Sequence, residues 1–141
     1  MAHAEALCRA RGERLTPIRR QVLETLAAEH RPLGAYEIID LLSAHTKRLA
    51  PITVYRALDF LVANALVHRI ESRNAYLACI NNHGASDLVV FLICERCSAV
   101  GEAPSSAVAE ILGAAAKAAG FLPRAPVIEI SGLCAHCRSH E

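Results

Sequence analysis

The chain has 141 residues, of which 53% are hydrophobic and 21% are charged, enough apolar material to bury the core of one ordinary domain or of two small ones. The longest apolar run, residues 88–94, is far shorter than the roughly 20 residues that cross a bilayer, and the charged residues 1–14 do not resemble a signal peptide. This composition excludes disordered, fibrous and membrane-spanning classes and predicts a folded cytoplasmic protein. Six cysteines are many for a compartment that keeps thiols reduced, which favours metal or redox chemistry.

The charge is distributed unevenly, although the net charge is only +1. Residues 1–80 contain 11 Lys and Arg against 8 Asp and Glu, whereas residues 81–141 contain 4 against 6. This asymmetry suggests two halves with different partners, although a difference of this size is also compatible with ordinary solvated surface.

The first half, residues 1–80, reads as helices followed by a hairpin. An alanine-rich segment ends at Gly12, a typical helix stop. Thr16 and Pro17 mark the start of the next helix, with the Thr16 hydroxyl expected to cap it. Apolar residues at helical spacing then predict helices over 35–45 and from Pro51 to about residue 65, and β-prone runs at 67–71 and 75–79 flank a polar turn. The last three of these helices and the two-stranded hairpin predict a winged helix-turn-helix domain.

The last of these helices is the candidate recognition helix, because the second helix of such a motif enters the major groove of DNA. Its polar face carries Thr53, Tyr55, Arg56 and Asp59. An aromatic residue beside an arginine on a helix face suits phosphate and base contacts, although both side chains could also be plain solvated surface. We predict DNA contacts from Thr53, Tyr55 and Arg56, together with Tyr36 on the preceding helix.

The second half, residues 81–141, changes character. It contains an apolar strand at 88–94, a short strand at 99–102, an alanine-rich helix at 106–119 that stops at Gly120, and a strand at 127–131. The helix carries Val108, Ile111, Leu112 and Ala115 on one face. A unit of about 60 residues is marginal alone, so we expect metal or dimerisation to stabilise it. The predicted fold class is therefore α+β, a winged helix-turn-helix followed by a small α/β dimerisation domain.

Two Cys-x-x-Cys pairs give the strongest chemical signal in the chain: Cys94 with Cys97, and Cys134 with Cys137. Two residues between cysteines allow a tight knuckle that points both sulfurs to one place, and two knuckles supply the four thiolates of a closed tetrahedral zinc site. A redox function of one pair would leave the second pair unexplained. We therefore predict a structural zinc ion.

An enzyme is not predicted. A zinc deaminase needs a His-x-Glu motif and a proline before the first cysteine of the pair, whereas Ile93 and Leu133 precede the two pairs here. Neither a Ser-His-Asp set nor a glycine-rich phosphate loop can be assembled.

Further potential metal ligands lie near the boundary between the halves. His68 and Cys79 fall on the two strands of the predicted hairpin, Asp87 and His83 lie in the following loop, and Glu102 lies on the next strand. Each alone reads as an ordinary polar or small apolar residue. Together they offer nitrogen, sulfur and oxygen donors that suit zinc, so we predict a second metal site.

The sequence resembles the ferric uptake regulator family over nearly its whole length. The resemblance is carried by Arg14-Leu15-Thr16-Pro17, by the run from Ala50 to Leu58, and by the two cysteine pairs. Within the family the chain is most similar to the zinc uptake regulators, through the run from Thr53 to Leu61 and through His68, Asn74-x-Tyr76 and Cys79.

The resemblance implies a structural zinc at the four cysteines and an exchangeable zinc at His68, Cys79 and Glu102, two ions per subunit. Relatives usually have a histidine where this chain has Asp87, so the fourth regulatory ligand is Asp87 or, alternatively, His83. The implied function is a homodimeric, zinc-dependent repressor of zinc-uptake genes that binds an AT-rich palindromic operator, with no membrane or small-molecule substrate as partner. The alternatives are an iron- or peroxide-responsive regulator of the same family, or a zinc storage or delivery protein that does not bind DNA.

Overall fold

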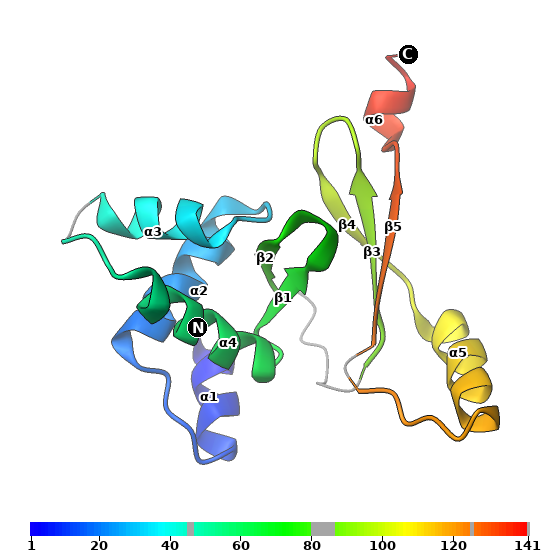
Figure 1. Cartoon of the computed structure of the whole chain (residues 1–141), viewed down its shortest axis with the longest axis horizontal. Coiled ribbons are helices and arrows are strands. Elements are labelled where there is room, and N and C mark those ends of the chain that lie inside the picture. Colours follow the sequence, from blue (N-terminus) through cyan, green and yellow to red (C-terminus); the bar gives the residue numbers. More distant parts are fainter. Residues whose placement is uncertain (45–46, 80–86, 125, 141) are drawn as a thin grey trace. The chain divides into compact units, whose positions relative to one another are not determined.

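The computed structural model describes residues 1–44, 47–79, 87–124 and 126–140. The chain divides into two compact units, Met1–His83 and Gly84–Glu141, and each unit is described by itself below. Unit 1 is helical with a small hairpin and unit 2 is a three-stranded sheet with helices (Figure 1), so the predicted α+β class is confirmed. Among the described residues, no helix is long and apolar enough to cross a membrane.

Unit 1 contains the predicted helices and hairpin. In chain order its elements are α1 (Ala2–Ala10), α2 (Pro17–Glu29), α3 (Ala35–Ser43), α4 (Pro51–Ala63), β1 (Val67–Ile70), the 3-10 turn η1 (Glu71–Arg73) and β2 (Ala75–Ala78). Proline occupies the first turn of both α2 and α4, where its fixed φ and missing N–H cost nothing.

The core of unit 1 is formed by one apolar face from each of three helices. The side chains that meet there are almost completely buried, and they are Val22 and Leu26 of α2, Ile38 and Ile39 of α3, and Val54, Leu58 and Leu61 of α4. Val62, an apolar residue at helical spacing near the end of the predicted helix, is 38% exposed, and Ala65 lies beyond the end of α4. The three-helix core is therefore as predicted, except at the last turn of α4.

Thr16 does not cap α2 as expected. Its side chain makes no hydrogen bond to the first turn, and its carbonyl instead accepts the N–H of Arg20 at 2.9 Å. The prediction that the Thr16 hydroxyl caps α2 is wrong. Pro17 by itself starts the helix with its preset φ, and the partly exposed first turn does not need a side-chain acceptor.

The hairpin β1–β2 is the wing. The strands are antiparallel, with Val67 opposite Ala78 and His68 opposite Leu77. Leu33, before α3, adds a bridge to Tyr76 through two backbone hydrogen bonds of 2.9 and 2.8 Å. The sequence did not predict this third segment, because a single bridging residue has no periodicity to detect.

Helix α4, the candidate recognition helix, ends in a Schellman motif. The Leu66 N–H donates to the Leu61 carbonyl at 2.9 Å, and the Ala65 N–H donates to the Val62 carbonyl at 3.0 Å. This motif requires a left-handed residue after the cap, which is usually glycine, and here Ala65 adopts a φ of 55°. An alanine in this conformation is strained by roughly 1–2 kcal/mol.

Replacing Ala65 with glycine should therefore stabilise the protein. The relief of strain is partly offset by the greater freedom of glycine in the unfolded chain, which leaves a net gain of about 0.5–1 kcal/mol in the free energy of unfolding. Ala27→Gly, at an exposed position inside α2, is the matched control and should cost up to about 1 kcal/mol. Urea denaturation measures the free energy of unfolding of both variants. Destabilisation by Ala65→Gly would show that Ala65 is not strained.

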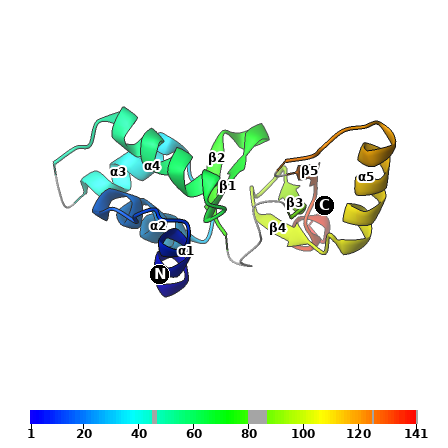
Figure 2. The same ribbon diagram turned by 90° about the horizontal axis from the view of Figure 1, so that it is seen from below.

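Unit 2 is a mixed sheet with a crossover helix. Its elements are β3 (Val89–Cys94), β4 (Val100–Ala103), α5 (Ser106–Ala118), β5 (Val127–Gly132) and the short α6 (Ala135–Arg138). The strand order is β4-β3-β5, with β3 antiparallel to β4 and parallel to β5. Helix α5 supplies the crossover that a parallel pair requires and lies to one side of the sheet (Figure 2).

Much apolar surface of unit 2 is uncovered in the single chain. No residue of α5 is buried, and Ile111 on its predicted apolar face is 70% exposed. On the sheet, Leu92 of β3 lies beside Ile130 of β5, and both side chains are about half exposed. The apolar periodicity of α5 is present, but in the part of the chain that the structure describes none of its side chains becomes buried.

Candidate metal centre and DNA-binding surface

The first cysteine knuckle follows directly from the end of β3. Cys94 is the last residue of the strand, its N–H donates to the Ala99 carbonyl at 2.9 Å, and its carbonyl accepts the Ser98 N–H at 3.0 Å. Ser98 has a φ of 62°, which turns the chain back tightly. The turn brings Cys97 round to the same side as Cys94.

The second knuckle lies at the start of α6. Cys134 is the N-cap of this helix, and its sulfur accepts the Cys137 N–H at 3.5 Å. The parallel register places Cys94 opposite Gly132, and the Glu95 N–H donates to the Gly132 carbonyl at 2.9 Å. Because parallel strands end at the same edge of a sheet, the two knuckles come to lie side by side.

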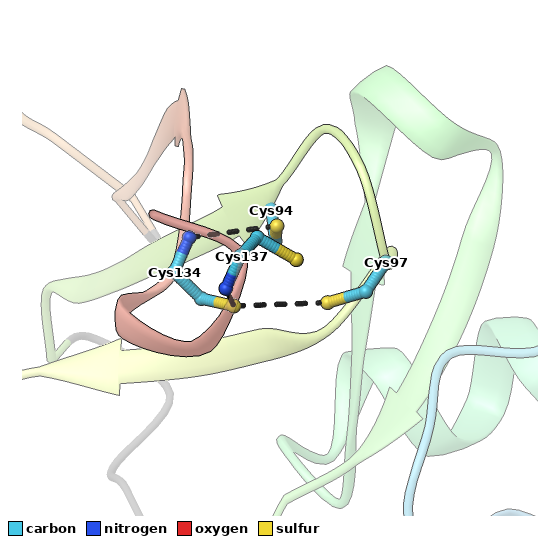
Figure 3. A group of neighbouring side chains, drawn as sticks. All are labelled: Cys94, Cys97, Cys134 and Cys137. Atoms are coloured by element: carbon cyan, nitrogen blue, oxygen red, sulfur yellow. Dashed lines mark hydrogen bonds between the residues drawn. The ribbon is translucent and has the colours of Figure 1, made fainter. Parts of the chain in front are cut away.

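The four sulfurs converge on one point (Figure 3). The four Sγ atoms all lie within 4.8 Å of one another, and the Sγ atoms of Cys97 and Cys134 are 3.8 Å apart. A tetrahedron with zinc–sulfur bonds of about 2.3 Å has edges of about 3.8 Å. The predicted residues are thus brought together in a donor set and at a spacing that fit a structural zinc ion.

The electrostatics of the cluster also fit a cation. The N–H groups of Cys97 and Cys134 lower the pKa of the Cys94 thiol to about 6, since they stabilise its thiolate. Burial, followed by the neighbouring sulfur of Cys134, raises the pKa of the Cys137 thiol. Four thiolates this close cannot all form without a compensating charge, and a divalent metal ion supplies that charge.

Arg96 ties the two knuckles together in a way that the sequence did not reveal. Its guanidinium, from the first knuckle, donates to the carbonyl of Cys137 in the second at 3.0 Å. Helix α6 was also missed, because four residues are too short for a periodic signal. Both features support the cluster from outside the sulfurs.

The residues of the predicted regulatory site are divided between the units. In unit 1, His68 lies on β1, and Cys79 extends the ladder beyond β2 by donating its N–H to the Leu66 carbonyl at 2.9 Å. Side chains alternate across a strand, so His68 and Cys79 lie on the same face of the wing as diagonal neighbours, whose Cα atoms are typically about 7–8 Å apart.

In unit 2, Glu102 lies on β4 opposite Phe91 of β3, and Asp87 is exposed just before β3. His83 lies outside the described residues. The regulatory ligand set remains a prediction.

The candidate DNA-binding surface is the outer side of α4. Thr53 and Tyr55 are half-buried, whereas Arg56 is exposed, and within the described part of the chain Arg56 has no hydrogen bond or ion pair. Tyr36 on α3 is 59% exposed. The predicted contact residues therefore lie on the two helices of the helix-turn-helix, with Arg56 available for a ligand.

A winged helix-turn-helix followed by a sheet unit with a four-cysteine centre defines a class of metal-containing DNA-binding regulators. The family model described as the ferric uptake regulator family matches residues 10–130. The chain belongs to the ferric uptake regulator family.

Relatives within the family are similar over almost the whole chain. The zinc uptake regulation protein of Escherichia coli (strain K12) is 40% identical over 137 residues, which cover 97% of this chain and 80% of that protein. A zinc uptake regulator complexed with zinc and DNA has a similar structure, with a TM-score of 0.90, 40% identity and coverage of 99% of this chain and 93% of the other. The crystal structure of holo XcZur gives a TM-score of 0.86 and 47% identity, covering 98% and 96%.

The metal centre yields a direct prediction. Cys97→Ser should lower the zinc content of the purified protein by one ion per subunit and make unit 2 unstable, because the free energy of binding a structural zinc is coupled to folding. Zinc content after gel filtration and a thermal melt measure both effects.

Cys8→Ala is the control, since Cys8 is buried in the core of unit 1. This variant should keep its zinc whatever its effect on stability. A Cys97→Ser protein with unchanged zinc and melting temperature would show that the four cysteines do not form the site.

Proposed function

We propose that this protein is a zinc-responsive transcriptional repressor that binds operator DNA as a homodimer and controls zinc-uptake genes in the cytoplasm. One observation carries the proposal: a winged helix and a four-cysteine centre occur together in a chain similar along nearly its full length to a zinc uptake regulator that has been seen with zinc and DNA. Its function is regulatory rather than enzymatic.

Two zinc ions per subunit have different functions in this proposal. The four-cysteine ion is structural, since all four positions of a tetrahedral site are filled by protein. The regulatory ion is held by His68, Cys79 and Glu102, with Asp87 or His83 as the fourth ligand. The shared face of His68 and Cys79 on the wing supports this set, and a thiolate among the donors favours zinc over iron or manganese.

The DNA-binding residues are Thr53, Tyr55 and Arg56 on α4 and Tyr36 on α3. The exposed guanidinium of Arg56 can donate two parallel hydrogen bonds to a guanine edge or to a phosphate. Tyr36 and Tyr55 offer hydroxyl groups and flat apolar rings. Two copies of α4 in a homodimer would read half-sites about 34 Å apart, as in an AT-rich palindromic operator.

The uncovered apolar surface of unit 2 supports the homodimer. The exposed large side chains there include Leu92 and Ile130 of the sheet, Val108, Ile111 and Leu112 of α5, and Phe121 and Leu122 beyond it. Leu92 and Ile130 border an open hollow of about 550 Å³. Exposed apolar side chains in this number point to an interaction site, and a second copy offers the same residues for a symmetric contact.

Regulation follows from the position of the ligands. His68 and Cys79 belong to the DNA-binding unit and Glu102 to the sheet unit, so a single ion bound by all three restrains the two units. A coupling free energy of typically 1–3 kcal/mol between metal and DNA binding gives a switch of about 5- to 150-fold.

The DNA-binding surface can be tested at Arg56. Arg56→Ala should weaken binding to operator DNA by about 1–3 kcal/mol and leave the zinc content unchanged, because no predicted ligand lies on α4. Lys117→Ala, the same charge change on exposed α5, is the control and should bind normally. Equal operator affinity of both variants in a mobility-shift titration would place the DNA surface elsewhere.

The regulatory site can be tested at Cys79. Serine is nearly as small as cysteine but a far poorer zinc ligand, so Cys79→Ser should keep the four-cysteine zinc and the dimer and lose zinc-dependent operator binding. The measurement is operator affinity against buffered free zinc, with iron as the comparison metal and Cys8→Ala as the control. Binding by Cys79→Ser at the same free zinc as the parent would remove Cys79 from the site.

The fourth ligand is decided by a parallel comparison. Asp87→Ala and His83→Ala are titrated with zinc under the same conditions. Only the variant that lacks the true ligand should need more zinc for operator binding.

A further inference from the structure

The C-terminal ends of α1 and of the recognition helix α4 are joined in unit 1. Both helices end in the same Schellman geometry, since the Glu13 N–H donates to the Cys8 carbonyl at 2.8 Å and Gly12 has a φ of 68°. The residue that caps α1 is Arg11 and the residue that caps α4 is Asn64. Their side chains are hydrogen-bonded, with the guanidinium of Arg11 donating to Oδ1 of Asn64 at 3.0 Å.

Asn64 is the one buried polar residue in the described part of the chain, with 3% exposure. Its Nδ2 donates to the carboxylate of Glu13 at 2.7 Å and to the carbonyl of Phe60 at 3.0 Å. The acceptor and both donors of the amide are therefore used. A buried amide that loses its partners is destabilising, so these bonds favour one position of the end of α4 relative to Arg11 and Glu13.

The hydrogen bonds of Asn64 to Arg11 and Glu13 are directional, unlike the apolar contacts that hold the rest of α4. Its buried face of valine, alanine and leucine is held by apolar contacts, which are not directional. A second contact acts near the same end of α4, because the guanidinium of Arg19 on α2 lies 3.5 Å from the centre of the Phe60 ring. The polar contacts therefore add a directional restraint at the C-terminal end of α4 to the apolar packing of its buried face.

We propose that Arg11, Asn64 and Glu13, here called the clasp, position the recognition helix for specific DNA binding. Arg56 precedes Asn64 by eight residues, about 12 Å along a helix. A tilt of about 5° at the clasp would then displace Arg56 by about 1 Å, more than a hydrogen bond to a base edge tolerates. Asn64 is a positioning residue, and the clasp rests on the proposed DNA-binding function.

A matched pair of substitutions at Glu13 isolates the clasp from charge. Glu13→Gln and Glu13→Ala remove the same negative charge, but only glutamine keeps an oxygen that can accept the Asn64 amide. Glu13→Ala should bind specific DNA about fivefold more weakly than Glu13→Gln, the equivalent of one hydrogen bond. Both should bind non-specific DNA equally, because that binding depends on charge.

Asn64→Leu removes the whole clasp without leaving a buried polar group on α4. Arg11 and Glu13 are exposed, so their side chains can turn to water. The ratio of specific to non-specific affinity should fall about tenfold or more, with unchanged zinc content. Ile39→Val, a mild core substitution in α3, is the control for stability alone, and it should lower the melting temperature while keeping this ratio.

The probes are a duplex selected from a random pool by the zinc-loaded wild-type protein and a non-specific genomic duplex, each titrated well below the melting temperatures. The clasp is supported if Glu13→Ala and Asn64→Leu lose specificity while Glu13→Gln and Ile39→Val retain it. The positioning function of the clasp is contradicted if Asn64→Leu keeps the wild-type ratio of specific to non-specific affinity, or if the two Glu13 variants bind the selected duplex with equal affinity. Failure of the wild-type protein itself to select any duplex would overturn the DNA-binding function, and the clasp with it.

Discussion

The parallel pairing of β3 with β5 is the constraint on which unit 2 depends. It joins residues separated by most of the unit, and it ends both strands at the same edge, with Cys94 opposite Gly132. The two knuckles then need only tight turns to bring four sulfurs within 4.8 Å. A parallel pair also requires a crossover, which explains why a strand and a helix separate the cysteine pairs. A one-residue slip of β5 would move Cys134 and Cys137 away from Cys94 and Cys97.

The two units obtain their stability differently. Unit 1 has a closed core of side chains from α1 to α4 and the wing, so it needs no further partner to bury its apolar faces. Unit 2 has a sheet with exposed apolar side chains, Leu92 and Ile130, and a helix, α5, with no buried residue. In the proposed function, metal binding at the knuckles and association with a second copy would supply what this small unit lacks. Loss of zinc from the four cysteines is therefore expected to affect unit 2 directly and to leave the core of unit 1 intact.

The parts of the fold that the sequence predicted have local signals. Helices α2 and α4 begin at Pro17 and Pro51 and have periodic apolar faces, and the spacing of the cysteine pairs defines their chemistry by itself. The missed features depend on contacts between distant residues: the bridge from Leu33 to Tyr76, the Arg96 bond to Cys137 and the Asn64 clasp. The regulatory ligands are only partly predictable for the same reason, since sequence places His68 and Cys79 on one hairpin but cannot choose between Asp87 and His83.

The end of α4 connects DNA recognition to the predicted regulatory site. Only Ala65, Leu66 and Val67 separate Asn64 from His68, and their backbone is fixed by the Schellman bonds, by the ladder to β2 and by the Leu66 bond to Cys79. A ligand that holds His68 therefore holds β1, and through this short segment it holds the end of α4. The clasp fixes that same end against α1. Because wing, recognition helix and α1 are joined so closely, zinc at His68 and Cys79 would act on the orientation of the whole DNA-binding unit rather than on the shape of its recognition helix.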